Sequence, residues 1–419
     1  MHYVIKPSEP VKTGEREPAL KYGKPAVMPA LMLSLAIPCG DAAAVDITAQ
    51  FRPGNTGNGF ENTTPSSGYC VEFGGCASGQ RSVALPVTYS RQVFSGLPPL
   101  PSRWSLRAPP QARVTLLSDT GATLAFDFQV THLAELLSGS GFSPYENPGF
   151  HWSTGGGCNF VNSHAFDAGA SMGFVWQVAN PLSPGLCYPT SGGVSEGERE
   201  IEPQVKSFSI GYRLVLPAPH TVAMGRYTGS LTWSVGETGD FSLGSQVSGL
   251  SSNSVTFNFE VDVEHELGIA FDDNAAQVVL EPRNGSWIEW MMGNISPTAQ
   301  LAGRLPMRVT TTGPFSVYME CQHTKQAGDC AIGNAHTGEL AAVATLISLP
   351  QGLVYQGAPV QRMRLDEHVH YAVDARRAIA GERGEVEFHT LNGEVQQMIK
   401  RGGDTYAGQV TLYFDARLL

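Results

Sequence analysis

The sequence predicts an all-β protein built from two immunoglobulin-like β-sandwich domains in tandem. Gly and Pro number 47 and 28 in a chain of 419 residues, and charged residues make up only 16%, so turns are frequent. Hydrophobic residues make up 42%, which is enough to build cores and too many for a disordered chain. Between the turns, apolar and polar residues alternate in short stretches, as they do in antiparallel sandwiches.

Residues 1–44 are interpreted as a signal peptide. Residues 26–37 read AVMPALMLSLAI, an apolar run too short to span a bilayer but suited to the hydrophobic part of a signal. Lysines precede this run, and residues 42–44 form an A-x-A cleavage pattern that makes Val45 the first mature residue. A buried apolar segment is the alternative, whereas a lipid anchor on Cys39 is disfavoured by the proline before it. We therefore expect an exported, soluble mature protein.

Alternating stretches recur along the mature chain and are separated by Gly, Pro, Asn and Ser. The expected strands are 45–51, 83–89, 112–117, 124–130, 207–216, 230–235, 254–263, 277–280, 395–398 and 409–414. The best helical window is 131–137, THLAELL. Without regular alternation of strands and helices, a Rossmann-like or barrel enzyme is disfavoured. A boundary within 258–264 divides the chain into an N-terminal domain, 45–260, and a C-terminal domain, 261–419.

A weak internal repeat locates an equivalent late strand in each domain. Residues 225–232, GRYTGSLT, and residues 404–411, DTYAGQVT, share the pattern Tyr-x-Gly-x-(Leu/Val)-Thr, although a chance match is the alternative. After the first copy the chain continues into 254–263, which can complete a sandwich. After the second copy only 415–419 follow the strand. We therefore expect the C-terminal domain to lack its last strand and to need one from elsewhere.

Six cysteines are left once the signal peptide is removed, and an even number in an exported chain indicates three disulfides. Sequence proximity favours Cys70 with Cys76, Cys158 with Cys187, and Cys321 with Cys330. Zinc is disfavoured because no CxxC-like pair is present. The net charge of −11 also argues against nucleic acid or an anionic membrane as a partner.

The second half of the chain resembles the tip adhesins and initiator subunits of colonisation-factor fimbriae and cable pili, the CfaE/CblD group. The resemblance is carried by 225–232, by 240–244 (DFSLG), 284–287 (NGSW), 312–319 (TGPFSVYM) with Cys321, and 406–415 (YAGQVTLYFD). It covers residues 212–419 well, whereas 45–210 match only in general layout.

The resemblance implies an N-terminal adhesin domain and a C-terminal pilin domain that accepts a donor strand from the next subunit. It implies four partners: a periplasmic pilus chaperone, an outer-membrane usher, a major pilin subunit and a host receptor. Val410, Leu412 and Phe414 share one face of the last strand and are expected to form the edge that contacts the donor strand and the chaperone. The resemblance also implies that the protein is exported through the periplasm to the cell surface and stays at the fimbrial tip.

Aromatic faces pack sugar rings and arginine pairs with carboxylates, so these residue types in the first domain suit a glycan site. The candidate receptor-binding residues are Arg103, Trp104, Trp152, His164, Arg213 and Arg226. The same residue types also occur in any sandwich without contacting a ligand.

No catalytic, metal or cofactor site is expected. Residues 169–173 match G-x-S-x-G, but residues 174–178 read FVWQV, a strand-like stretch where a nucleophile elbow needs a helix. His368 and His370 with Asp366 could share a strand face and bind zinc, although a solvated face is commoner. A minor structural pilin without receptor binding and a secreted carbohydrate-active enzyme are the alternative functions.

Overall fold

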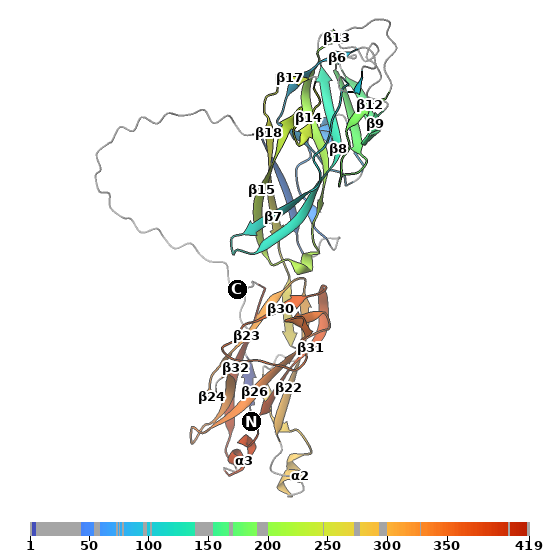
Figure 1. Ribbon diagram of the computed structural model, residues 1–419. Helices are drawn as coiled ribbons and strands as arrows, with labels where there is room; N and C mark the ends of the chain where they lie inside the picture. The colour runs from blue at the N-terminus through green and yellow to red at the C-terminus, as the bar shows by residue number, and fades with distance from the viewer. Residues whose placement is uncertain are drawn as a thin grey trace, which may run out of the picture. The chain divides into compact units, whose positions relative to one another are not determined.

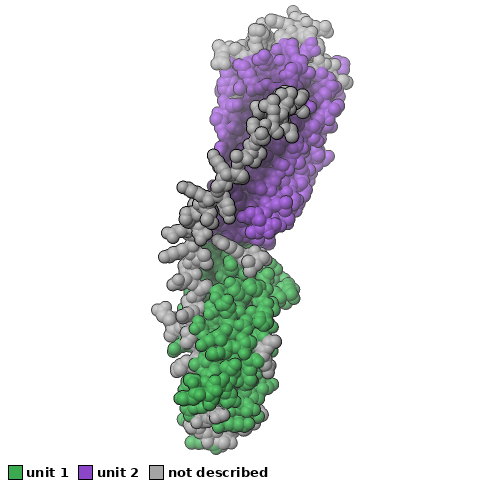
Figure 2. Space-filling view, turned by 90° about the vertical axis from the view of Figure 1, so that its left-hand side faces the viewer, with its two compact units in different colours: residues 1–38, 265–419 green, residues 39–264 purple. Residues whose placement is uncertain are grey.

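The computed structural model describes most of the chain in a series of ranges. They are 2–5, 43–53, 59–72, 74, 76–77, 79–94, 99–100, 103–138, 154–166, 171–190, 200–245, 247–271, 277–292, 300–326, 328–400 and 403–416. The chain divides into an N-terminal unit, Cys39–Glu264, and a C-terminal unit, His265–Leu419 together with Met1–Pro38 (Figures 1 and 2). Both units are built almost wholly of strands, so the predicted all-β class is confirmed.

In its described residues, the N-terminal unit contains strands β2 to β18 and short helical turns. The strands are β2 (Ala44–Phe51), β3 (Glu61–Asn62), β4 (Ser82–Leu85), β5 (Tyr89–Arg91), β6 (Val93–Phe94), β7 (Ala112–Ser118), β8 (Thr123–Ser138), β9 (Thr154–Gly156), β10 (Cys158–Phe166), β11 (Ser171–Val178), β12 (Cys187–Pro189), β13 (Glu200–Ile201), β14 (Gln204–Val215), β15 (Gly225–Gly236), β16 (Phe241–Ser242), β17 (Val247–Ser248) and β18 (Ser254–Val263). The turns are α1 (Tyr69–Glu72) and η3 (Pro219–Thr221).

The main path of its 13-stranded sheet runs β17-β5-β14-β8-β7-β15-β18-β2-β3. Inward-facing side chains of β8, β15 and β18 supply the centre of the core, where the rings of Phe128 and Trp233 stack 5.3 Å apart. The expected alternation of buried and exposed residues is complete in β18, from Val255 to Val263.

The predicted helix at 131–137 is wrong, because these residues continue β8. Leu133 and Leu137 face the main core, whereas Ala134 packs with Tyr69 and Val175 on the opposite face. Both faces of this half of the strand are therefore covered. Consecutive apolar residues here reflect two buried faces, and a short window cannot distinguish that pattern from a helical stripe.

The C-terminal unit contains β1 and β19 to β32. The strands are β1 (His2–Ile5), β19 (Leu267–Phe271), β20 (Gln277–Val279), β21 (Glu281–Pro282), β22 (Leu301–Thr311), β23 (Phe315–Cys321), β24 (Thr324–Gln326), β25 (Asp329–Asn334), β26 (Leu340–Ser348), β27 (Leu353–Tyr355), β28 (Ala358–Pro359), β29 (Met363–Arg364), β30 (Tyr371–Ala375), β31 (Ile379–Thr390) and β32 (Tyr406–Asp415). Its helices are α2 (Trp287–Met291) and α3 (Glu394–Ile399). None of the helices in the described ranges has the length and apolarity needed to cross a membrane.

The main path of the 15-stranded sheet in this unit is β19-β22-β31-β26-β25-β32-β23-β30-β27-β28. The expected strand at 395–398 is wrong, because these residues lie in α3. Val395 and Met398 are buried and three residues apart, which is the spacing of one helical face. Gly393 precedes the helix with a φ of 84°, a left-handed conformation that suits glycine.

All three predicted disulfides are present. They join Cys70 to Cys76, Cys158 to Cys187, and Cys321 to Cys330. The last one closes the insertion between β23 and β25, which pair with successive parts of the same edge of β32. It therefore holds two partner strands in line along the final strand.

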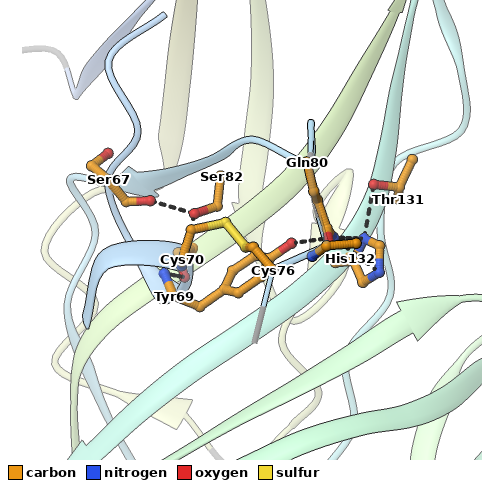
Figure 3. Close-up of a disulfide and its surroundings, with 10 residues drawn as sticks. Ser67, Tyr69, Cys70, Cys76, Gln80, Ser82, Thr131 and His132 are labelled. Atoms are coloured by element: carbon orange, nitrogen blue, oxygen red, sulfur yellow. Dashed lines mark hydrogen bonds between the residues drawn. A yellow bond between two sulfur atoms is a disulfide. The ribbon is translucent and has the colours of Figure 1, made fainter. Parts of the chain in front are cut away.

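The Cys70–Cys76 loop is anchored by a polar cluster on β8 (Figure 3). The amide nitrogen of Gln80 lies 2.8 Å from the hydroxyl of Tyr69 and 3.0 Å from Nδ1 of His132. Thr131 Oγ1 also lies 2.9 Å from this ring nitrogen. Burial lowers the pKa of His132 from 6.5 to about 4, because the interior penalises the charged imidazolium.

This depressed pKa predicts a loss of stability in mild acid. The unfolded chain takes up a proton near pH 6.5 that the folded chain accepts only near pH 4, so the contribution of neutral His132 is full above pH 6.5 and declines as the pH falls toward 4. We expect the urea midpoint of the N-terminal unit to fall between pH 7 and pH 5, and to fall less in His132→Gln. Parallel pH profiles for the two proteins, followed by tryptophan fluorescence, would contradict this expectation.

Candidate functional site

The two copies of the sequence repeat form equivalent strands, β15 and β32. The shared tyrosines, Tyr227 and Tyr406, are both buried. The hydroxyl of Tyr227 donates a hydrogen bond to the carbonyl oxygen of Ala223 at 2.8 Å, four residues upstream. A tyrosine near the start of a late strand that bonds back to the preceding backbone is the tyrosine corner of immunoglobulin-like sandwiches.

The shared glycines of the repeat, Gly229 and Gly408, each lie close to a neighbouring strand. A Cβ atom on Gly229 would lie 2.8 Å from Cδ2 of Leu116, and one on Gly408 would lie 2.7 Å from the carbonyl oxygen of Ala331. The backbone of β25 therefore excludes a Cβ at Gly408, and a Cβ at Gly229 would require the buried Leu116 side chain to shift. The repeat thus marks structurally matching strands in the two units.

In the N-terminal unit, the outer edge of β15 is fully paired. All ten residues of β18 pair antiparallel with β15, from Gly225↔Val263 to Ser234↔Ser254. On its other side β18 pairs in parallel with all eight residues of β2. The strand that comes after the repeat therefore closes the sheet between the late strand and the first strand of the unit.

In the C-terminal unit, the matching place beside β32 is occupied by β1, from the other end of the chain. The four residues His2–Ile5 pair in parallel with 407–410 of β32, and the first three of them also pair antiparallel with β20. This strand runs opposite in sense to β18 and is much shorter. Among the strands of the described ranges, none pairs with Thr411–Asp415 on this edge, since β23 occupies the opposite edge.

The side chains below this edge are those expected to contact a donor strand. Val410 and Leu412 are buried in the core. Phe414 lies beyond the end of β1 and is only half-buried, with its ring 6.4 Å from that of Phe315. The inward-facing side chains of β32 are thus less buried toward its C-terminal end, where the pairing with β1 has ended.

The candidate receptor-binding residues lie in different environments. Trp104 is a core residue whose ring packs 6.0 Å from that of Phe174, and Trp152 lies outside the described residues. Arg103 is half-buried near Tyr188, 5.8 Å from the ring, and donates to the carbonyl oxygen of Pro189 at 3.4 Å. A glycan site therefore cannot rest on the buried Trp104.

The other candidates are further apart along the sheets. His164 is exposed on β10, where its ring lies 4.6 Å from that of Phe166. Arg213 donates to Gln129 at 2.7 Å, and Arg226 is paired with acidic residues of β18. Arg213 and Arg226 are on β14 and β15, which β8 and β7 separate in the sheet. The four described arginine and histidine candidates thus do not form one cluster.

The metal and nucleophile candidates also lack the expected setting. His368 lies in a turn and His370 is exposed just before β30, so the two histidines do not share a strand. In the described part of the chain, no group of three His, Cys, Asp or Glu residues is arranged to hold a metal ion. Ser171 is the first residue of β11, and the glycine at position 169 lies outside the described residues.

Sequence reasoning missed a buried charged cluster in the N-terminal unit. Arg91 and Glu135 have side chains that are 1% and 0% exposed, and Nε of Arg91 lies 3.3 Å from a carboxylate oxygen of Glu135. The hydroxyl of Tyr89 donates to the same carboxylate, and Arg91 donates to the carbonyl oxygen of Ser105 at 3.1 Å. Burial raises the pKa of Glu135, whereas Arg91 opposes this rise. The signal in the sequence is a glutamate at an inward position between Leu133 and Leu137.

Searches of protein families and of curated proteins find no match to this chain. Among solved structures, it is similar to the chaperone-tip adhesion subunit pre-assembly complex CsuC-CsuE from archaic chaperone-usher Csu pili of Acinetobacter baumannii. That match has 10% identity and a TM-score of 0.20, and covers 89% of this chain and 99% of the other. It is also similar to CfaE, the adhesive subunit of CFA/I fimbria of enterotoxigenic Escherichia coli, with 8% identity, a TM-score of 0.24, and coverage of 88% and 98%.

The buried ion pair predicts a large effect of a single substitution. Glu135→Leu leaves the guanidinium of Arg91 buried without its partner and should destabilise the N-terminal unit by about 3–5 kcal/mol. The double variant Arg91→Met with Glu135→Leu removes both charges and should recover most of this loss. Urea unfolding followed by tryptophan fluorescence measures both changes. Equal losses in the single and double variants would contradict the assignment of the effect to an unpaired charge.

Proposed function

We propose that this chain is the tip adhesin and assembly-initiating minor subunit of a chaperone-usher fimbria. The observation that carries the proposal is the contrast between the two units. A ten-residue antiparallel strand closes the N-terminal unit, whereas a four-residue parallel strand lies in the matching place of the C-terminal unit. An edge of this kind pairs readily with an extended segment of another protein.

Under this proposal the C-terminal unit is a pilin domain that accepts a strand between β20 and β32. A periplasmic chaperone covers the edge first, and the major subunit then supplies the donor strand after delivery to the outer-membrane usher. Alternate apolar side chains of the donor pack on Val410, Leu412 and Phe414, while its backbone pairs with Thr411–Asp415. Removal of residues 1–44 with the signal peptide would also remove β1 and open the whole edge.

The N-terminal unit would then bind a host-surface receptor, which we propose to be a glycan. Arg103 beside Tyr188 places a cationic group next to an aromatic face, and both side chains are half-buried. Such groups suit a sugar that carries a carboxylate. The role of the protein is then binding and assembly, and not catalysis.

A minor shaft subunit without receptor binding is the second candidate. It would need a free N-terminal strand to donate to the next subunit, and residues 45–51 have the required alternation. In the structure, these residues belong to β2, which is paired with β18 along its whole length. This pairing favours the tip position over the shaft.

The proposal predicts that the mature chain, starting at Val45, is unstable or aggregation-prone alone. Fusing the donor strand of the major subunit after Leu419 should give a stable monomer, because the added strand pairs the open edge and covers the core. Leu412→Asp should abolish this gain, since it buries a charge under the donor at a cost of several kcal/mol. Size-exclusion chromatography and thermal unfolding measure these effects.

Thr411→Asn is the control, because residue 411 is half-buried on the other face of the same strand and asparagine places no charge opposite Glu320. It should retain most of the gain. An unfused mature chain that is monomeric and as resistant to heat as the fused one would show that the C-terminal unit is not a strand acceptor.

Receptor binding is tested with the fused full-length mature protein on a glycan array. We expect binding to acidic glycans, and a loss of at least tenfold in affinity for Arg103→Ala, which corresponds to about 1.4 kcal/mol. Arg226→Ala serves as the control, because Arg226 is paired with Glu260 and Asp262 on a different strand pair. Failure of the fused protein to bind any glycan would instead favour the role of a structural subunit.

A further inference from the structure

Three aromatic rings form a ladder across neighbouring strands of the C-terminal unit. The rings of His370 and Tyr318 are stacked with centroids 4.2 Å apart, and those of Tyr318 and Tyr413 with centroids 4.6 Å apart. Their planes are inclined by only 17° and 7°. These spacings are close to the distance of about 4.8 Å between paired strands, so the ladder follows the sheet.

The strand register places the three residues directly opposite one another. Tyr318 on β23 pairs with Tyr413 on β32. Val317 pairs with Tyr371 on the other side of β23, which places His370 opposite Tyr318. The ladder is therefore fixed by backbone pairing. A further strand beside β32 would add one side chain to it, at the position opposite Tyr413.

The ladder lies on the outer face of the sheet, opposite the apolar floor. Met319 and Leu412, the sequence neighbours of ladder residues, are buried in the core, whereas Tyr318 and Tyr413 are half-exposed. The hydroxyl of Tyr413 donates to a carboxylate oxygen of Glu320 at 2.8 Å, which holds the ring in place. The ladder therefore lies on the opposite face of β32 from the inward-facing residues Val410, Leu412 and Phe414, which we call the apolar floor.

One end of the ladder lies at the edge proposed to accept a strand. Tyr413 is within the part of β32, Thr411–Asp415, that no strand of the described ranges pairs with on that edge. The segment just before it, 407–410, is paired with β1, so the same edge already accepts a strand along its first half. A longer strand would place one outward side chain against the face of the Tyr413 ring that points away from Tyr318.

The surroundings of the ladder are negatively charged. Glu320 accepts the hydrogen bond from Tyr413, and Asp415 lies two residues further along the same face of β32. Burial raises the pKa of the Tyr318 hydroxyl, and the negative charges of Asp415 and Glu320 raise it further. A planar cation satisfies this site best, because arginine can stack on a tyrosine ring and pair with a carboxylate at the same time.

We propose that Tyr413 is a specificity-determining contact that selects a partner-subunit strand carrying arginine at the outward position opposite it. The inference rests on the proposed function, because it needs a donor strand on this edge. The outward-facing residue of the donor strand is then selected by Tyr413, whereas its inward-facing residues are selected by apolar packing. The ladder then distinguishes among strands whose apolar patterns are equally suitable.

The test uses the full mature chain with a host strand of alternating valine and threonine fused after Leu419 through a tight turn. The fused strand can then run antiparallel to β32, as β18 does to β15. A single guest residue, Arg, Phe, Ala or Glu, is moved through the outward positions of the host. The equilibrium constant for unfolding is measured in urea for each fusion.

At one outward position, we expect Arg to make unfolding about 2- to 5-fold less favourable than Ala, the range of an exposed cation–aromatic contact. Glu should be the poorest guest there because of Glu320 and Asp415. The advantage of Arg should vanish in Tyr413→Leu and persist in the control Thr411→Ala. Loss of the ladder alone should leave the fused protein folded, because the apolar floor is unchanged.

The outcomes separate the two proposals. If no fusion stabilises the chain, even with Ala as guest, the strand-acceptor function itself fails. If all fusions stabilise it but Arg and Ala are equivalent at every outward position, the acceptor function stands and the ladder has no selective role. If Phe stabilises the fused protein more than Arg does, stacking without charge determines the choice, and the proposal of an arginine is overturned.

Discussion

The pairing of the last strand in each unit is the constraint on which the structure depends. A strand that covers a core must have its backbone hydrogen-bonding groups satisfied on both edges and its inward side chains covered. In the N-terminal unit β18 meets both needs beside β15. In the C-terminal unit β32 pairs along 406–407 and 410–415 on the side of β25 and β23, and only along 407–410 on the side of β1. The proposed assembly role is a consequence of that asymmetry.

Several features of this arrangement could be predicted from the sequence because they depend on local patterns. Alternation predicted the strands at 254–263 and 409–414, and proximity predicted the disulfides, including the one between Cys321 and Cys330. The repeat around Tyr227 and Tyr406 predicted matching strands, since both tyrosines are buried at the start of equivalent strands. These signals need no knowledge of distant contacts.

The remaining features depend on contacts that no window of sequence contains. The second half of β8 has two covered faces because Tyr69 packs on its second face, where Ala134 lies beside Val175 of the paired strand β11, and this half therefore looked like a helix. The helix at Glu394–Ile399 depends on a left-handed Gly393 and was predicted as a strand. Arg91 and Glu135 are partners on strands that are not adjacent in the sheet, and the aromatic ladder needs the register of three strands. The candidate receptor residues were chosen by type alone, which is why buried Trp104 was included.

The most direct measurement of the central claim is amide hydrogen exchange along β32 and β15 in the mature chain, with and without a fused donor strand. Without the donor, the amides of Thr411–Asp415 that point away from β23 should exchange rapidly, while the amides of β15 that point toward β18 should be protected. With the donor, both sets should be protected. Equal and strong protection of Thr411–Asp415 in the unfused chain would show that β32 is already complete, and would contradict a strand-accepting edge.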